Sequence, residues 1–448
     1  MSVVRPDPRD REILRLAVPA FLALVAEPLF LLADAAIVGH LGTAPLAALG
    51  IAAVVLQTVV GLCVFLAYGT TASVARRLGA GDLRGALAQG VDGLWLAGAI
   101  GAVVTGAGVL LAGPLVRLFG ASDDVADPAA TYLRIAFLGT IPLLVMLAAT
   151  GVLRGLQDTR TPLLVAVGGN ALNVALNLVL VYPAGLGLAG SALGSVLAQA
   201  ASAGALLVVV VRAARARGAA LRPDLPGIRA AGRTGLPLVV RTLTLRAAFL
   251  VTTYAVTTAA VGPRDQEVDL ATHQLALTIW GFLAFALDAI AIAAQAITGR
   301  ALGAGHVEGT RALTRRMIAW GAGSGVVTGI VLAALSPVLG SLFTGDAAVR
   351  DLLAPVLLVV ALGQPVAGVV FVLDGVLIGA GDGRYLAGAG LVTFVVYAPV
   401  ALACAAASAS LVALWVAFSA VFMGARLVLL LVRARSTRWL VTGVATVG

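Results

Sequence analysis

One carboxylic acid, Asp34, lies inside an apolar stretch that is long enough to cross a lipid bilayer. Residues 16–38 contain only two ionisable side chains, Glu27 and Asp34, and as a helix they would span about 34 Å. Burying a carboxylate in a membrane costs about 2.5 to 3.5 kcal/mol on insertion scales, so such acids usually serve transport or proton transfer. Asp34 is therefore a candidate for binding a coupling ion. The alternative is a structural acid that is protonated or hydrogen-bonded to a neighbouring helix.

A second apolar stretch contains three amides, Asn170, Asn173 and Asn177, whose spacing of three and four residues places them on one face of a helix. Asn177 has the membrane depth of Asp34, and Ser195 in the next stretch lies slightly lower. Carboxylate, amide and hydroxyl oxygens suit a proton or a hard monovalent cation. We therefore expect these residues to form a site for H⁺ or Na⁺. The alternative, which we favour for Asn170, is that the amides only join helices, at about 0.6 kcal/mol for each hydrogen bond.

Two prolines in the first stretch favour a bend. Pro19 and Pro28 each remove a helical hydrogen bond, and Glu27 precedes Pro28 on the face that carries Asp34. A bent helix whose acids change partners would act as a switch, although a kink alone is weak support for one.

The second half of the chain contains buried charges of both signs. Arg241, Arg246, Asp288 and Asp374 lie inside apolar stretches, at depths that differ. Either acid neutralises Arg241 in a structural ion pair, or it binds substrate or protons, and the sequence leaves both open.

Other polar residues receive simpler interpretations. Three charged residues near the ends of apolar stretches are expected to reach the membrane surface, namely Asp92, Arg134 and Arg426. The histidines lie at or near predicted loops without clustering, so no metal centre or histidine-based catalytic site is predicted; they are His40, His273 and His306.

Composition identifies an integral membrane protein. The 448 residues are 60% apolar and 11% charged, with a mean hydropathy of +1.05. The net charge of +9 comes from arginine alone, in short loops that form no basic face with interleaved aromatic residues, so no nucleic-acid partner is predicted. Cys63 and Cys404 lie in apolar stretches and are interpreted as small core residues.

Charged loops and Gly/Pro pairs divide the chain into twelve apolar spans. They are residues 16–39, 49–75, 86–113, 129–153, 162–182, 187–211, 235–261, 270–298, 312–336, 353–378, 386–408 and 410–433. With a cytoplasmic N-terminus, 23 arginines fall on the cytoplasmic side and three on the outer side. This bias predicts twelve helices with both termini in the cytoplasm.

An internal repeat divides the protein into two halves. Residues 78–82 (LGAGD) recur as 302–306 (LGAGH). A longer stretch, VLRGLQDTR at 152–160, recurs in the same register as VLIGAGDGR at 376–384. Because each half has six spans, the repeat is parallel, about an axis along the membrane normal.

The repeat predicts an all-α polytopic fold with two six-helix lobes. We expect an N-lobe at 1–211, a cytoplasmic linker at 212–234 that contains prolines and arginines, and a C-lobe at 235–448. Two such lobes around a central cavity are expected to move by rocking.

Several motifs resemble those of the multidrug and toxic compound extrusion (MATE) family, in particular its DNA-damage-inducible F (DinF) branch. They are Pro19 with Asp34 and residues 37–41, and residues 76–81, 152–155, 169–177, 287–289 and 373–380. The resemblance covers essentially the whole chain, and the combination of motifs is specific.

The resemblance implies cation-driven efflux of organic, often cationic, amphiphilic compounds by a V-shaped pair of helix bundles. It also implies that Asp34 is the N-lobe acid used for H⁺ or Na⁺ coupling, with Asn173 and Ser195 as polar neighbours. Several members carry a second acid where this chain has Asn177, which weakens a relay of two carboxylates. We favour H⁺, because desolvation brings a lone buried acid into the working pH range.

The sequence thus predicts a secondary antiporter rather than an enzyme, with no cofactor except H⁺ or Na⁺ as coupling ion. We expect a monomer in the lipid bilayer of the cell's plasma or inner membrane, with a small organic substrate. The runner-up is a flippase for a lipid-linked saccharide or phospholipid, which should need several cavity arginines where only Arg241 and Arg246 qualify. A third alternative, a membrane-embedded transferase, would need a cluster of polar catalytic groups at one membrane face. The sequence shows no such cluster.

Overall fold

The computed structural model of the chain describes residues 8–260 and 262–444, which form helices joined by short turns and contain no strand. An apolar chain in a membrane must satisfy its backbone hydrogen bonds within itself, and the helix does so within one segment. The predicted all-helical architecture is confirmed.

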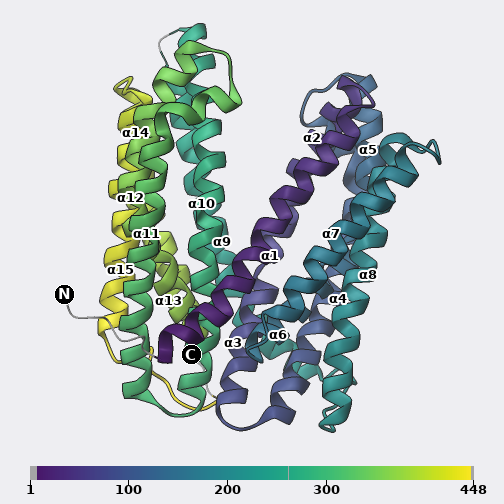
Figure 1. The fold of residues 1–448 in the computed structure, drawn as a ribbon, viewed down its shortest axis with the longest axis vertical. Helices are drawn as coiled ribbons and strands as arrows, with labels where there is room; N and C mark the ends of the chain where they lie inside the picture. The colour runs from purple at the N-terminus through teal and green to yellow at the C-terminus, as the bar shows by residue number, and fades with distance from the viewer. Residues whose placement is uncertain (1–7, 261, 445–448) are drawn as a thin grey trace. The chain divides into compact units, whose positions relative to one another are not determined.

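The first half contains eight helices (Figure 1). They are α1 (Pro8–Gly39), α2 (Thr43–Cys63), α3 (Phe65–Gly79), α4 (Leu83–Arg117), α5 (Asp123–Leu138), α6 (Thr140–Gly155), α7 (Arg160–Val181) and α8 (Gly187–Ala216).

The second half contains seven α-helices and one π-helical turn. They are α9 (Leu225–Ala259), α10 (Pro263–Gly303), α11 (Val307–Phe343), α12 (Ala347–Gly379), α13 (Gly383–Ala406), α14 (Leu411–Ala417), the π-helical turn Phe418–Phe422 and α15 (Met423–Arg435).

Twelve spans are obtained when each apolar helix or helix pair is counted once. Eleven candidate spans have the length and hydropathy to cross a membrane, and α5 with α6, bent by 45°, is the twelfth. Pro142 explains the break between α5 and α6, since its ring clashes with the carbonyl of residue 138, where α5 ends. The predicted number of spans is confirmed.

The sequence repeat is also a repeat of backbone conformation. The turns after α3 and after α10 each place a glycine, Gly81 and Gly305, at φ 78°. The turns after α6 and after α12 place Gln157 at φ 66° and Gly381 at φ 74°. Both pairs keep the register of the sequence repeat, so the two halves turn in the same way at matching positions.

The described chain forms two compact units. The N-unit contains residues 18–236, and the C-unit contains residues 237–444 together with residues 8–17. Both α1 and α9 therefore begin in one unit and end in the other. Within the predicted linker 212–234, only residues 217–224 are non-helical. The lobe boundaries at 211 and 235 stay a prediction.

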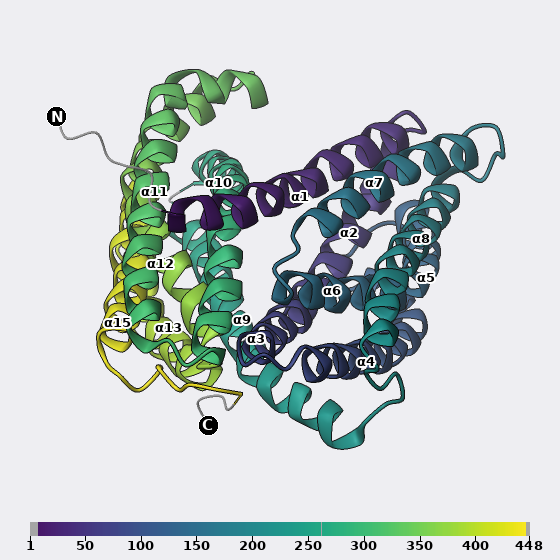
Figure 2. The same cartoon turned by 60° about the horizontal axis from the view of Figure 1, so that its bottom comes forward.

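Small residues let the helices of each unit approach closely. In the N-unit, α6 packs against α3 and α4, and α7 packs against α8 (Figure 2). In the C-unit, α12 lies at the centre against α10 and α11. At the crossing of α11 with α12, a Cβ on Gly321 would lie 2.5 Å from the carbonyl oxygen of Gly368. Such small-residue contacts are typical of helix packing in membranes.

We predict that Gly321→Ala destabilises the C-unit. The added methyl collides with backbone that cannot move without separating the two helices, and overpacking of this kind costs about 1 to 3 kcal/mol. Gly323→Ala on the same helix is the matched control, because its Cβ would meet nothing within 4 Å. Thermal unfolding of the purified proteins in detergent measures the difference, and equal melting temperatures would contradict the prediction.

Candidate functional site

The carboxylate of Asp34 is buried where three helices of the N-unit meet. Asp34 on α1 is 4% exposed. Its Oδ1 accepts hydrogen bonds from Nδ2 of Asn177 on α7 at 2.8 Å and from Oγ of Ser191 on α8 at 2.6 Å. Hydrogen bonds to a carboxylate are stronger than neutral ones. The acid therefore joins α1, α7 and α8.

The other two amides of α7 also bond to neighbouring helices. Asn173 donates from Nδ2 to Oγ of Ser195 on α8 at 3.1 Å. Asn170 donates to the carbonyl oxygen of Ala26 on α1 at 2.9 Å. Asn170 thus makes the helix-joining contact that was favoured for it, whereas Asn173 and Asn177 lie in the buried polar cluster.

Two oxygens of this cluster are buried without a hydrogen-bond donor. Oδ1 of Asn173 and Oδ1 of Asn177 have no hydrogen-bond partner in the described structure. Unpaired buried acceptors are costly and rare in native proteins, so these two oxygens are free to accept a hydrogen bond from a bound group or to ligate a cation. Together with the Asp34 carboxylate they form an oxygen-rich site that suits a proton or a monovalent cation.

No basic side chain neutralises Asp34. Within residues 8–260 and 262–444, no Arg or His forms an ion pair with it. Its hydrogen-bond donors are neutral, so the cluster carries one negative charge when Asp34 is ionised. That charge is available to a bound cation.

The proposed switch residues of α1 are placed differently from Asp34. The helix runs without interruption through Pro19 and Pro28. Glu27 is exposed and makes no hydrogen bond or ion pair within the described part of the chain. Its role in a switch stays a prediction.

In the C-unit, one acid binds two arginines. The Asp374 carboxylate on α12 accepts from Nη2 of Arg241 on α9 at 2.7 Å and from Nη2 of Arg426 on α15. The structural alternative for Arg241 is therefore realised with Asp374. Of the other two charges, Asp288 lies half-buried on α10 and Arg246 is exposed on α9.

The surface position expected for Arg426 is wrong. This side chain is buried, and together with Arg241 and Asp374 it lines a small pocket that Leu245 and Leu386 close on the apolar side. The Asp374 carboxylate explains the difference. Its hydrogen bond to the guanidinium replaces the hydration that an unpaired arginine would find at the membrane surface.

Two further expectations are corrected. Asp92 is buried and accepts a hydrogen bond from the backbone N–H of Asp224 at 3.2 Å. This bond holds the connection between α8 and α9, residues 217–224, against α4. His273 lies fully buried inside α10, beside Thr253 at 3.1 Å, and not near a loop. In both cases a hydrogen-bond partner inside the protein takes the place of water. The pattern of apolar residues in the sequence does not reveal such a partner.

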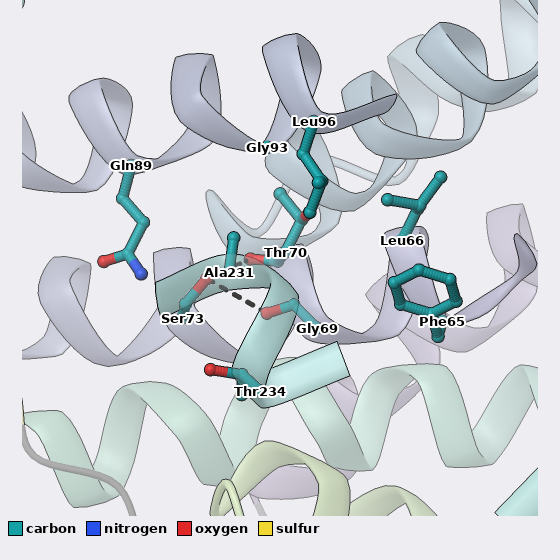
Figure 3. Close-up of a pocket in the computed structure, with 10 residues that line it drawn as sticks. All are labelled: Phe65, Leu66, Gly69, Thr70, Ser73, Gln89, Gly93, Leu96, Ala231 and Thr234. Carbon is teal, nitrogen blue, oxygen red and sulfur yellow. Dashed lines mark hydrogen bonds between the residues drawn. The ribbon is translucent and has the colours of Figure 1, made fainter. Parts of the chain in front are cut away.

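Figure 3 shows a second polar region of the N-unit, a small pocket that Gln89 and Ser73 line together with Thr234 of α9. Ser73 donates to the backbone carbonyls of Gly69 and Thr70. This small pocket is lined by hydroxyl, amide and apolar groups and by no ionisable side chain. It has no group for proton or charge transfer.

A surface ion pair links the start of α10 to the turn before α12. Nη2 of Arg264 lies 2.6 Å from Oδ2 of Asp346. The Arg264 guanidinium, together with a backbone N–H, holds the pKa of Asp346 below its ordinary value. This pair is lost only when the pH falls below that lowered pKa, and as an exposed pair it adds little stability.

Comparison with known proteins settles the family. The MatE family model matches residues 19–179 and 243–403. The chain belongs to the MATE family. The two matches keep the register of the sequence repeat, which confirms it, and MATE proteins are transporters of drugs and toxins, not enzymes.

Relatives of this MATE protein include DETOXIFICATION 44, chloroplastic, of Arabidopsis thaliana, which is 32% identical over 84% of this chain and 74% of its own length. DNA damage-inducible protein F of Escherichia coli is 29% identical over 66% of this chain and 64% of its own length. The predicted resemblance to the family and to DinF is confirmed.

Solved transporter structures share the fold. A MOP superfamily transporter from Pyrococcus furiosus is 23% identical, with a TM-score of 0.85 and 96% of each chain covered. The Vibrio cholerae MATE transporter VcmN in the bent form is 20% identical, with a TM-score of 0.85, and the match covers 95% of this chain and 97% of that chain.

Two residues of the Asp34 cluster were missed from the sequence. Ser191 donates to Asp34, and Tyr132 on α5 lies buried beside Ser191. The spacing of Ser191 and Ser195, four residues apart on α8, places both hydroxyls on one helix face and could have revealed the first. Tyr132 gave no such signal, because its stretch contains no other polar residue at that spacing.

We predict that Asp374→Ala strongly destabilises this MATE protein. The change leaves the guanidinium groups of Arg241 and Arg426 buried without their carboxylate, and breaking a buried ion pair costs about 3 to 5 kcal/mol. Asp351→Ala, an exposed acid on the same helix α12, is the matched control. Thermal unfolding in detergent distinguishes the two, and an unchanged melting temperature for Asp374→Ala would show that the ion cluster does not hold the unit together.

Proposed function

We propose that this MATE protein is a secondary antiporter that exports organic compounds in exchange for H⁺ bound at Asp34. One observation carries the proposal: a buried carboxylate in a membrane span has neutral hydrogen-bond donors and no basic partner among the described residues. Such an acid is a poor structural element, since its charge is uncompensated, but a suitable ion carrier.

Protonation of Asp34 would change the hydrogen bonds that join three helices. The ionised carboxylate accepts from Asn177 and Ser191, whereas a protonated carboxyl also has one O–H to donate. Oδ1 of Asn177 is a nearby acceptor that has no partner. Binding a proton therefore removes a charge from the membrane span and favours a different arrangement of α1 against α7 and α8.

The prolines of α1 support a movement of this helix. Pro19 and Pro28 each lack the N–H of a helical hydrogen bond, which lowers the cost of a local bend. If proton and substrate favour different positions of α1, each lowers the affinity for the other by the same factor, which is the requirement of exchange. The switch then needs no direct contact between the two ligands.

Na⁺ is the second candidate for the coupling ion. The unpaired oxygens of Asn173 and Asn177 favour it, because a hard cation needs several oxygen ligands around one carboxylate. H⁺ remains our first choice, since Asn177 provides an amide where a second carboxylate would increase the attraction for a metal cation.

The names of relatives support the substrate class that we propose. Relatives of this chain are named probable multidrug resistance proteins NorM in Thermotoga maritima and Xanthomonas campestris, which supports small organic substrates over the lipid-linked substrates of a flippase. We propose cationic or amphiphilic compounds, because ionised Asp34 attracts positive charge to the site.

We propose a position in the plasma or inner membrane, and the arginine distribution supports an orientation with both termini in the cytoplasm. Since both coupling ion and substrate are small, we propose that a monomer in the bilayer is the working unit.

We predict that Asp34→Asn abolishes gradient-driven export. Ethidium efflux is followed in cells while the proton and sodium gradients are collapsed separately. Wild-type efflux should fall at least tenfold when the proton gradient alone is lost, and the Asp34→Asn protein should be inactive under all conditions. Asp124→Asn, an exposed acid of the same unit, is the control. Export by Asp34→Asn at the wild-type rate would refute the proposal.

We further predict that Asn173→Ala separates the two coupling ions. The change removes one cluster oxygen without touching the hydrogen bonds of Asp34. With H⁺ as coupling ion, the pH dependence of efflux by the variant should match that of the wild type. With Na⁺, the concentration needed for half-maximal efflux should rise at least tenfold, and this result would replace H⁺ by Na⁺.

A further inference from the structure

The helix that carries Asp34 begins in one unit of the protein and ends in the other. Residues 8–17 of α1 belong to the C-unit, whereas the rest of α1 belongs to the N-unit. The helix between Asp10 and Asp34 is about 36 Å long. Whatever holds residues 8–17 therefore holds one end of the helix whose other end binds the coupling ion.

Asp10 is bound by three hydrogen bonds from α11. Its Oδ1 accepts from Nε of Arg316 at 2.7 Å and from Nε1 of Trp320 at 2.8 Å, and its Oδ2 accepts from Nη2 of Arg316 at 2.6 Å. The arginine contact is bidentate, which fixes orientation as well as distance. The Asp10 side chain is 14% exposed, so water competes little for it.

A second acid of the same turn binds a different helix. Glu12 forms an ion pair with Arg300, near the end of α10. Asp10 and Glu12 lie in the first turns of α1, where negative charge also interacts favourably with the helix dipole. The start of α1 is thus bound to both α10 and α11 through charge.

Apolar contacts complete the attachment. Ile13, Leu16 and Ala17 are buried in the C-unit, whereas the neighbouring Arg11, Leu14 and Arg15 are exposed. We call residues 8–17 the N-terminal clasp. Its end at Ala17 is followed within two residues by Pro19, where the helix can bend at low cost.

The start of α9 is attached in a different way. Its residues 225–236 belong to the N-unit. There Gly235 packs so closely on Phe65 that a Cβ would collide with the ring. Ala231 and Thr234 line the pocket of Figure 3. Within residues 8–260 and 262–444, this attachment is made by packing and contains no ion pair like that of Asp10. In the described part of the chain, α1 is thus held in its second unit by paired charges and α9 by packing.

We propose that the N-terminal clasp is a coupling element, and that Asp10 and Glu12 are positioning residues for transport. By holding the start of α1 in the C-unit, the clasp transmits to that unit a movement of α1 that begins at Asp34 in the N-unit. The proposal rests on the proposed role of Asp34 only for the origin of this movement. Neither acid binds the coupling ion or the substrate.

The first test asks whether the charges close the clasp. In a background in which the two cysteines, Cys63 and Cys404, are replaced by alanine, Ala17→Cys places a buried thiol in the clasp. Labelling of the purified full-length protein by a water-soluble maleimide should be slow, and Asp10→Asn should accelerate it at least tenfold. Arg316→Gln should do the same, with no further increase in the double variant.

Glu308→Gln is the matched control for this test. Glu308 pairs with Arg311 on α11, the helix that binds Asp10, and its side chain is exposed. Its labelling rate should stay within twofold of the parent. Equal rates for Asp10→Asn and the parent would overturn the proposal.

The second test asks whether the closed clasp is needed for transport. Ethidium efflux is measured per molecule of folded protein, so a loss of expression or stability does not count. Asp10→Asn with Glu12→Gln should lower the efflux rate at least fivefold and leave the pH for half-maximal efflux unchanged. The charge-reversed pair Asp10→Arg with Arg316→Asp should recover at least half of the parent rate.

Efflux at the parent rate from a protein with an open clasp would overturn the proposal. So would a shift in the pH for half-maximal efflux that accounts for the whole loss of rate, since it would place Asp10 in ion binding. An active Asp34→Asn protein beside a slow Asp10→Asn protein would refute the function of Asp34 and leave the clasp in place.

Discussion

The buried carboxylate of Asp34 must keep its hydrogen bonds, and the structure of the N-unit follows from that requirement. A buried charge that has no basic partner among the described residues needs donors, and these come from α7 and α8, two helices that are remote in sequence from α1. Gly194, between Ser191 and Ser195 on α8, permits the close approach of α7, because a Cβ at this position would lie 2.1 Å from Oδ1 of Asn177. A change in the charge of Asp34 therefore cannot stay local, because the same bonds determine how three helices pack.

The repeat shows that this site belongs to one half only. In the register of the repeat, Asn173 and Ser191 correspond to Tyr397 and Trp415, both of which contact the ring of Phe418 in the C-unit. Asp34 itself corresponds to Thr258. Two halves with the same turns and helix order thus contain different chemistry at matching positions: a polar cluster in one and an aromatic cluster in the other. Duplication supplied the fold, and substitution inside the bundles produced the difference.

The fold could be predicted almost completely from the sequence, and the site could be predicted in part. Spans, repeat and family follow from hydropathy and motifs, which are local, and the amide face of α7 follows from helical spacing. Partners across helices were harder to foresee. Arg426 and Asp92 were expected at the membrane surface because each lies near the end of an apolar stretch. Their burial depends on Asp374 and on the backbone of Asp224, and no pattern within one stretch contains that information.

A comparison of two buried acids, Asp34 and Asp374, shows why residue type alone does not assign a function. The carboxylate of Asp374 is paired with two guanidinium groups, so removing its charge would leave both positive charges buried without a counter-charge. Asp34 is held by an amide and a hydroxyl, which are neutral in either state. Its charge can therefore change without leaving an opposite charge unpaired. An acid of the second kind suits the ion carrier that we propose for Asp34, whereas an acid of the first kind, such as Asp374, joins three helices of its own unit through charge.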